Sequence, residues 1–111
     1  MASTNPELNI TKNVRTIEWL KGEMVTAVGT LFKALARDSE EAMVNALAGL
    51  ILSCYFLGKR LGLSFQKIDD AVEQRLQLPQ MQQHEIEEWY GDVSSLENYW
   101  QERKPSEKNQ L

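Results

Sequence analysis

The chain has 111 residues, 16 of them acidic and 12 basic, and its formal net charge at pH 7 is −4. This length corresponds to one domain, and the acidic balance, without any cluster of lysine and arginine, argues against a nucleic-acid partner. Cys54 is the one cysteine and lies in an apolar run, which excludes a disulfide framework and favours a reducing compartment. Because the opening MASTNPELNI is polar and unlike a secretory signal, we expect a cytoplasmic protein.

Residues 1–9 and 104–111 are polar, and we expect them to form flexible tails on either side of a single helical domain over residues 10–103. Within that domain the sequence shows no strand-like alternation, whereas apolar residues recur at helical spacing in every segment. The sequence therefore predicts an all-α bundle of four to five helices.

The first helix is predicted over residues 11–37. Gly22 and Gly29 are expected to bend or interrupt it, because glycine is a poor helix former. Its apolar residues are spaced three, four or seven apart and should form one buried stripe: Val14, Ile17, Met24, Val28, Leu31 and Leu35.

A second helix is predicted from Asp38, which has capping-box spacing to Glu41, to Gly62, a residue suited to a left-handed helix end. This helix is apolar on nearly every face and must be covered on all sides. We therefore expect a homodimer, or a higher homo-oligomer, whose interface includes this helix. The interface candidates form a stripe of small residues, which could equally fill a close crossing within one chain: Ala42, Ala46, Gly49 and Ser53.

The same helix is the only candidate for a membrane span. Residues 42–57 carry no charge, but this run is shorter than the roughly 20 apolar residues that a span needs. Acidic residues precede the run and basic residues follow it, which suits the dipole of any soluble helix. We therefore expect a core helix and no membrane partner.

Three shorter elements are predicted downstream. A helix over residues 65–77, preceded by Ser64 and closed by Pro79, should bury Phe65, Ile68, Val72 and Leu76. Residues 82–90 should form a short polar helix, and a final helix should begin at Ser94, which has capping-box spacing to Glu97. The aromatic residues between Trp89 and Trp100 would mark a surface for a protein partner if they are exposed.

The order of these helices, and the passage LGLSFQKIDDAVEQRL after the long apolar helix, resemble the MazG-like all-α nucleoside triphosphate pyrophosphohydrolases over about residues 12–78. In that family a helix bearing Glu-Glu-x-x-Glu faces a helix bearing Glu-x-x-Asp, and these carboxylates hold magnesium over the triphosphate. The chemistry agrees with this arrangement, because Mg²⁺ prefers hard oxygen ligands and side chains three or four apart share one helix face.

The resemblance fixes a register. Leu61, Leu63 and Ser64 look like the family's Leu-x-Ile-Ser ending, which places the Glu-x-x-Asp positions at Ala46 and Gly49. On the first helix TAVGTL stands where the family has Glu-Glu-Leu-Gly-Glu-Leu. The three remaining carboxylate positions are therefore Thr26, Ala27 and Thr30. With all five positions small and uncharged, we expect no metal cofactor and a non-catalytic role in binding, regulation or assembly.

An alternative hypothesis is that the protein retains the pyrophosphohydrolase activity implied by the resemblance. Glu85, Glu88 and Asp92 could share one face of a continuous helix and form a displaced magnesium site, although Gly91 threatens that continuity. The protein would then be a Mg²⁺-dependent nucleoside triphosphate pyrophosphohydrolase. A solvated acidic face explains the same residues with fewer assumptions. His84 is the one histidine and is expected to be solvated, because no nucleophile or zinc set accompanies it.

Overall fold

The computed structural model describes residues 6–103, and all regular secondary structure in this range is α-helical. The predicted all-α fold is therefore confirmed. The described helices are α1 (Pro6–Arg37), α2 (Glu40–Arg60), α3 (Phe65–Leu76), α4 (Pro79–Gln82), α5 (Glu85–Tyr90) and α6 (Asp92–Arg103).

The chain divides into two compact units, one ending at Phe65 and one starting at Gln66. A single domain over residues 10–103 stays a prediction. At the N-terminal end α1 already begins at Pro6, inside the segment 1–9 expected to be a tail. The rest of both expected tails, residues 1–5 and 104–111, lies outside the described range.

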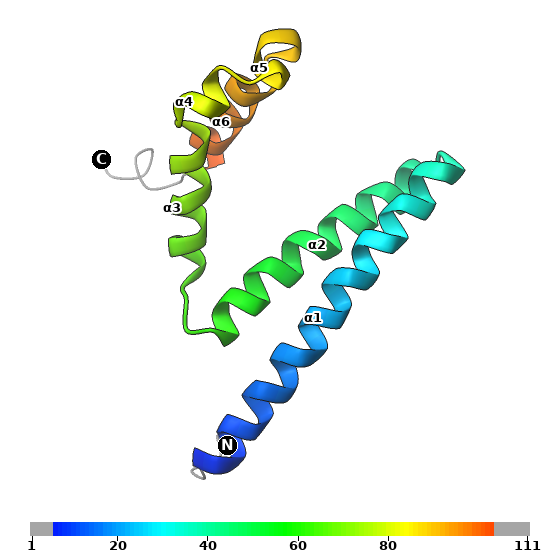
Figure 1. The fold of residues 1–111 in the computed structure, drawn as a ribbon, viewed down its shortest axis with the longest axis vertical. Coiled ribbons are helices and arrows are strands. Elements are labelled where there is room, and N and C mark those ends of the chain that lie inside the picture. Colours follow the sequence, from blue (N-terminus) through cyan, green and yellow to red (C-terminus); the bar gives the residue numbers. More distant parts are fainter. Residues whose placement is uncertain (1–5, 104–111) are drawn as a thin grey trace. The chain divides into compact units, whose positions relative to one another are not determined.

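The first unit is a hairpin of the long helices α1 and α2, which lie side by side (Figure 1). α1 runs through Gly22 and Gly29 without a break, so the expected interruption does not occur. The two helices meet along narrow stripes that repeat every three or four residues and include several small side chains. The most buried members of this seam are Leu20, Ala34, Ala46 and Ser53.

The predicted apolar stripe of α1 is only half correct. Ile17, Met24 and Leu31 are half-buried along the seam with α2. The other three members are largely exposed: Val14 (54%), Val28 (39%) and Leu35 (53%). A helix with a single neighbour buries only a narrow stripe, so a broad apolar face leaves its flanking residues uncovered.

The turn between the two helices differs from the predicted cap. Asp38 adopts a left-handed conformation (φ 55°) and ends α1. Ser39 instead is the N-cap of α2, and its hydroxyl accepts a hydrogen bond from the Ala42 N–H at 3.3 Å. The predicted capping box of Asp38 and Glu41 is therefore wrong, because Asp38 is already used to close the preceding helix.

The end of α2 agrees with the sequence. Gly62 has a φ of 89°, and the Leu63 N–H donates to the Gly58 carbonyl at 2.9 Å. The Gly62 N–H donates to the Lys59 carbonyl at 3.1 Å, which completes a Schellman motif. Phe65 then returns against α2, and its ring meets the ring of Tyr55 edge-on at a centroid distance of 5.7 Å.

The second unit contains the remaining short helices. α3 agrees with the predicted helix over residues 65–77, although only Leu76 of its four predicted core residues is fully buried. α3 ends at Leu76 and α4 begins at Pro79. The single helix predicted over 82–90 is interrupted at Gln83 and His84, where α4 ends and α5 begins. The Gln82 amide donates to the Leu76 carbonyl at 2.6 Å and to the Glu97 carboxylate at 3.1 Å, which links α3, α4 and α6.

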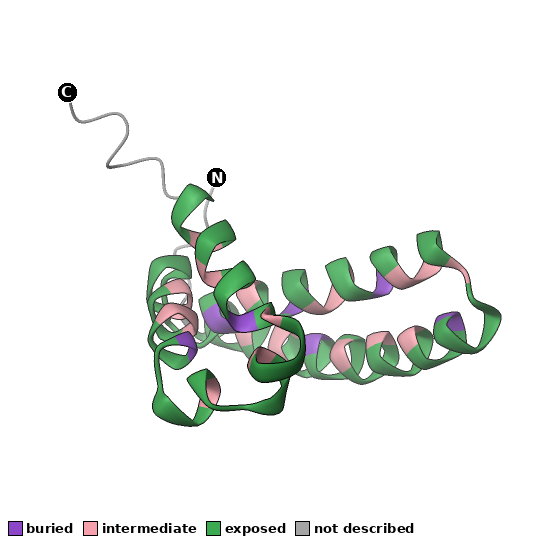
Figure 2. Cartoon of the chain, turned by 90° about the horizontal axis from the view of Figure 1, so that it is seen from above, coloured by how far each residue is buried: buried purple, intermediate pink, exposed green. Residues whose placement is uncertain are grey.

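Most residues of the hairpin are exposed (Figure 2). α2 in particular carries large apolar side chains in contact with solvent, among them Leu47, Ile51 and Phe56. By length and composition alone α2 could cross a membrane, a property that it shares with the core helices of soluble proteins. The expectation that it is a core helix therefore depends on what covers it.

Candidate functional site

The principal candidate site is a cavity of about 390 Å³ between α1 and α2. Four residues of each helix line it, and in both helices they have the spacing i, i+3, i+4, i+7, which places four side chains on one face. The lining residues are Glu23, Thr26, Ala27 and Thr30 of α1 with Ala42, Asn45, Ala46 and Gly49 of α2.

All five positions that the family register assigns to carboxylates line this cavity: Thr26, Ala27, Thr30, Ala46 and Gly49. Two sets of residues about 20 positions apart in the chain are thus brought to one place, as the facing helices of the family would require. Glu23, Ala42 and Asn45 complete the wall. The repeat by three or four residues could have indicated Glu23 and Asn45, since each lies one helical turn from a predicted position.

The cavity wall contains few polar groups and one ionisable side chain. Its polar groups are the Thr26 and Thr30 hydroxyls, the Asn45 amide and one carboxylate, that of Glu23. Within residues 6–103 these four side chains make no hydrogen bond to another protein group, so they are available to a ligand. The remaining wall consists of methyl groups and the bare backbone of Gly49. The hydroxyl, amide and carboxylate groups of this wall can form hydrogen bonds with a small polar molecule.

The glycine in the wall does not result from tight packing. A Cβ atom built at Gly49 would meet no other atom within 4 Å. A methyl group at this position would therefore meet no neighbour, so close packing is not the reason for the glycine.

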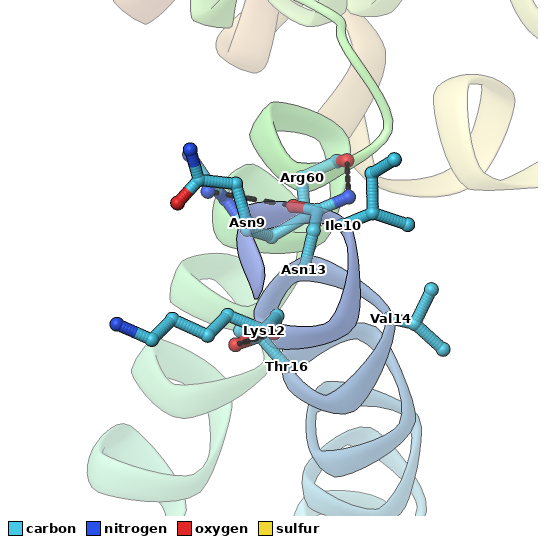
Figure 3. A pocket seen from close by; sticks show the side chains of 7 residues that line it. All are labelled: Asn9, Ile10, Lys12, Asn13, Val14, Thr16 and Arg60. Atoms are coloured by element: carbon cyan, nitrogen blue, oxygen red, sulfur yellow. Dashed lines mark hydrogen bonds between the residues drawn. The ribbon is translucent and has the colours of Figure 1, made fainter. Parts of the chain in front are cut away.

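A larger concavity, of about 550 Å³, lies at the open end of the hairpin and includes Lys12, Asn13 and Arg60 (Figure 3). The Asn13 amide donates to the Arg60 carbonyl at 2.9 Å, and the Arg60 guanidinium donates to the Asn13 side-chain oxygen at 3.4 Å. These groups satisfy one another, so we interpret this end as a structural junction between α1 and α2.

The displaced acidic set is not assembled. Gly91 has a φ of 68° and ends α5, so Asp92 belongs to the next helix. The continuous helix that would place Glu85, Glu88 and Asp92 on one face is therefore absent from this region. In the whole described range, no group of three or more His, Cys, Asp or Glu residues is arranged to hold a metal ion.

The acidic residue that the structure uses in this region is Glu87. Its carboxylate accepts hydrogen bonds from the Ser94 hydroxyl and from the Ser94 N–H, the latter at 2.9 Å. These two bonds, the hydroxyl first, hold the pKa of Glu87 below its ordinary value. The predicted capping box of Ser94 and Glu97 is wrong, because α6 already begins at Asp92 and Ser94 binds Glu87.

His84 is exposed, as expected, and it also has a structural role. It is the N-cap of α5, and its Nδ1 accepts a hydrogen bond from the Ile86 N–H at 3.0 Å. Of the aromatic residues near it, Trp89 and Tyr90 are more than 60% exposed. Trp100 is half-buried beneath Arg103, whose guanidinium carbon lies 4.8 Å from a ring centroid. A protein partner on this segment stays a prediction.

The small-residue stripe of α2 faces α1. Ala46 and Ser53 are 6% and 8% exposed within the single chain, and Ala42 and Gly49 line the cavity. Ala46 and Ser53 thus fill the contact with α1, whereas Ala42 and Gly49 border an open space. A dimer interface that includes this stripe stays a prediction.

One of three comparisons with known proteins gives a match. A family model described as "MazG-like family" matches residues 10–93. A comparison with curated proteins gives no significant match, and neither does one with solved structures. The match extends across both units and includes every helix that lines the cavity. On this basis the chain belongs to the MazG-like family.

Proposed function

We propose that this protein has a non-catalytic role in binding, regulation or assembly. It does not catalyse the magnesium-dependent hydrolysis of nucleoside triphosphates. One observation carries the proposal. The five positions where the family resemblance implies carboxylates line a single cavity, and none of them bears a charge: Thr26, Ala27, Thr30, Ala46 and Gly49.

The physical argument concerns charge. A magnesium ion in a protein needs oxygen ligands, and carboxylates supply the negative charge that offsets its desolvation. Glu23 is the one carboxylate in this wall, where the family arrangement implies five. Two hydroxyls and an amide add weak neutral ligands. We therefore expect no resident metal in the cavity, and a triphosphate would lack the cation that positions it for attack.

The direct test is pyrophosphate release from a panel of nucleoside triphosphates in the presence of Mg²⁺ or Mn²⁺. The purified full chain at high concentration is compared with a buffer blank and with an active member of the pyrophosphohydrolase family. We expect the chain to match the blank while the active relative turns over.

Metal-dependent release would contradict the proposal. Glu88→Gln would then decide between the two sources of activity, since loss of turnover in that variant would indicate the displaced acidic set. Glu23→Gln is the matched substitution in the cavity, and a selective loss there would instead place the metal between α1 and α2.

A further inference from the structure

Two adjoining hollows lie between α1 and α2 toward the open end of the hairpin. The smaller one, of about 230 Å³, is lined by Thr16, Trp19, Leu20, Phe56, Lys59 and Arg60. The larger one, of about 550 Å³, is the concavity around Lys12 and Asn13 (Figure 3). Thr16 and Arg60 line both hollows, so the two are continuous. Neither shares a lining residue with the candidate site.

The smaller hollow has mainly apolar walls. Trp19 of α1 and Phe56 of α2 each contribute a ring, and these side chains are 62% and 49% exposed, so much of each ring is open to a ligand. Leu20 is only 2% exposed and closes the hollow toward the seam of the hairpin. An apolar cavity of about 150 Å³ is large enough to bind benzene. The smaller hollow can therefore hold one aromatic ring.

Three cationic side chains line the two hollows: Lys12, Lys59 and Arg60. Within residues 6–103, none of them has a carboxylate at ion-pair distance. The Lys59 ammonium lies 5.5 Å from the centroid of the Phe65 ring, a contact that holds the side chain but does not neutralise its charge. The hollows therefore combine apolar walls with positive charge that an anion can compensate.

The end of α2 does not oppose an anion at this place. Its last four carbonyls, those of residues 57–60, would leave partial negative charge here if they had no partners. The carbonyls of residues 57–59 accept hydrogen bonds from the N–H groups of residues 61–63, and the Arg60 carbonyl accepts one from the Asn13 amide. A helix dipole amounts to about half an elementary charge at this end. The two full charges of Lys59 and Arg60 outweigh it.

Arg60 keeps hydrogen-bond donors for a ligand. A guanidinium has five N–H groups in a planar fork, and the bond to the Asn13 side-chain oxygen, at 3.4 Å, uses one of them. A carboxylate can accept two parallel hydrogen bonds from such a fork. The net charge of −4 disfavours a ligand with several negative charges, and no group of metal ligands in residues 6–103 could hold a cation to offset them. A singly charged carboxylate fits best.

We propose that the two adjoining hollows form one binding site for an aromatic carboxylate. The ring lies in the apolar hollow between Trp19 and Phe56, and the carboxylate lies in the larger hollow, where it is bound by Arg60 and Lys12. Arg60 lines both hollows and therefore stands where the ring and the charge of the ligand meet. This site is separate from the cavity of the five uncharged positions, so it does not depend on whether the chain hydrolyses triphosphates.

The test is calorimetry on the full chain with 3-phenylpropionate as the probe. We expect one molecule to bind per chain with a dissociation constant below about 1 mM. The neutral analogue 3-phenylpropanamide and the ringless anion propionate should each bind at least about 10-fold more weakly, because each lacks one of the two groups that the site recognises. Equal binding of the amide and the carboxylate, or no binding of 3-phenylpropionate, would overturn the proposal. Tighter binding of phenyl phosphate or adenosine monophosphate would indicate a phosphate site and would overturn it as well.

Matched variants locate the bound probe. Trp19→Ala removes a ring from the site, whereas Trp89→Ala removes one from the second unit at nearly equal exposure, 62% against 64%. Lys12→Gln removes a charge from the site, whereas Arg15→Gln removes one from an exposed position on the same helix outside both hollows. We expect Trp19→Ala and Lys12→Gln each to weaken binding at least about fivefold and the two controls to change it less than about twofold. Equal losses in the site and control variants would show that the probe binds elsewhere. The comparison of the three probes uses the wild-type chain and does not depend on the folding of a variant.

Discussion

Asn13 of α1 and Arg60, the last residue of α2, join the open end of the hairpin although they lie 47 positions apart in the sequence. The Asn13 amide donates to the Arg60 carbonyl, one of the carbonyls that the end of a helix leaves without an intrahelical partner. The Arg60 guanidinium returns a hydrogen bond to Asn13. A single side chain thus satisfies a helix end and links the two helices.

Replacing Asn13 should weaken the hairpin. Asn13→Ala removes both hydrogen bonds and leaves the Arg60 carbonyl to water, so we expect a loss of about 1 kcal/mol in the free energy of unfolding. Urea denaturation followed by circular dichroism measures this difference. Arg15→Ala, an exposed change nearby on α1, is the control and should alter stability by less than about 0.5 kcal/mol. Equal effects of the two substitutions would show that the link contributes nothing.

The residues that end α1 and α2 allow two substitutions with opposite expected effects on stability. Asp38 and Gly62 each follow a helix in a left-handed conformation, with φ values of 55° and 89°. Glycine is favoured in this conformation, whereas a side chain costs roughly 1–2 kcal/mol, less for aspartate. Gly62→Ala should therefore lower the melting temperature, and Asp38→Gly should raise it slightly or leave it unchanged. A higher melting temperature for Gly62→Ala than for the wild type would contradict the assignment of the Schellman motif.

These turns also show why helices were easier to predict than their ends. Apolar residues at helical spacing correctly predict α1, α2 and α3, because this spacing is a property of each segment by itself. Asp38 and Ser39 both suit a cap, and only the left-handed turn after α1 decides that Ser39 is used. Ser94 likewise matches a capping box, but Gly91 starts the next helix earlier and directs Ser94 to Glu87. Such choices depend on the neighbouring element and cannot be read from local spacing.

Glu87 and Ser94 predict a dependence of stability on pH. Because the folded-state pKa of Glu87 lies below its ordinary value of 4.5, the unfolded chain binds the proton more readily. The stabilisation by this pair is therefore complete above that ordinary value and is lost as the pH falls through the folded-state pKa. Ser94→Ala should raise the pKa of Glu87 toward 4.5, as measured by NMR titration of its carboxyl carbon. An unchanged pKa in Ser94→Ala would show that the hydroxyl does not stabilise the carboxylate.

The candidate site was predictable because of its spacing. The register from the family resemblance placed five residues on two helices, and helical geometry alone brings each set to one face. What the sequence left open was whether the two helices leave space between Thr26 and Gly49 or close on each other. Small side chains from both helices leave a cavity of about 390 Å³ there. Glu23 is not among the predicted site residues, because the resemblance implies carboxylates at five other positions and none at this one.

The site can be tested by restoring the charges. We expect a variant with Thr26→Glu, Ala27→Glu, Thr30→Glu, Ala46→Glu and Gly49→Asp to bind Mg²⁺ and Mn²⁺, because its carboxylates would converge on the cavity between α1 and α2. A Cβ atom at Gly49 meets no other atom within 4 Å, whereas a carboxylate at the buried Ala46 position should lower stability in the absence of metal.

Metal binding to this carboxylate variant is measured by calorimetry and by the change in its melting temperature. Bound metal should raise the melting temperature, because a metal concentration of 100 times the dissociation constant adds about 2.7 kcal/mol to the free energy of unfolding. The control carries Gln and Asn at the same five positions, which keeps side-chain size and removes the charge. We expect metal to stabilise only the carboxylate variant, and the wild type to show no change. A folded carboxylate variant that fails to bind metal would show that these five positions do not form the family's metal site, and the proposed loss of catalysis would then need another explanation.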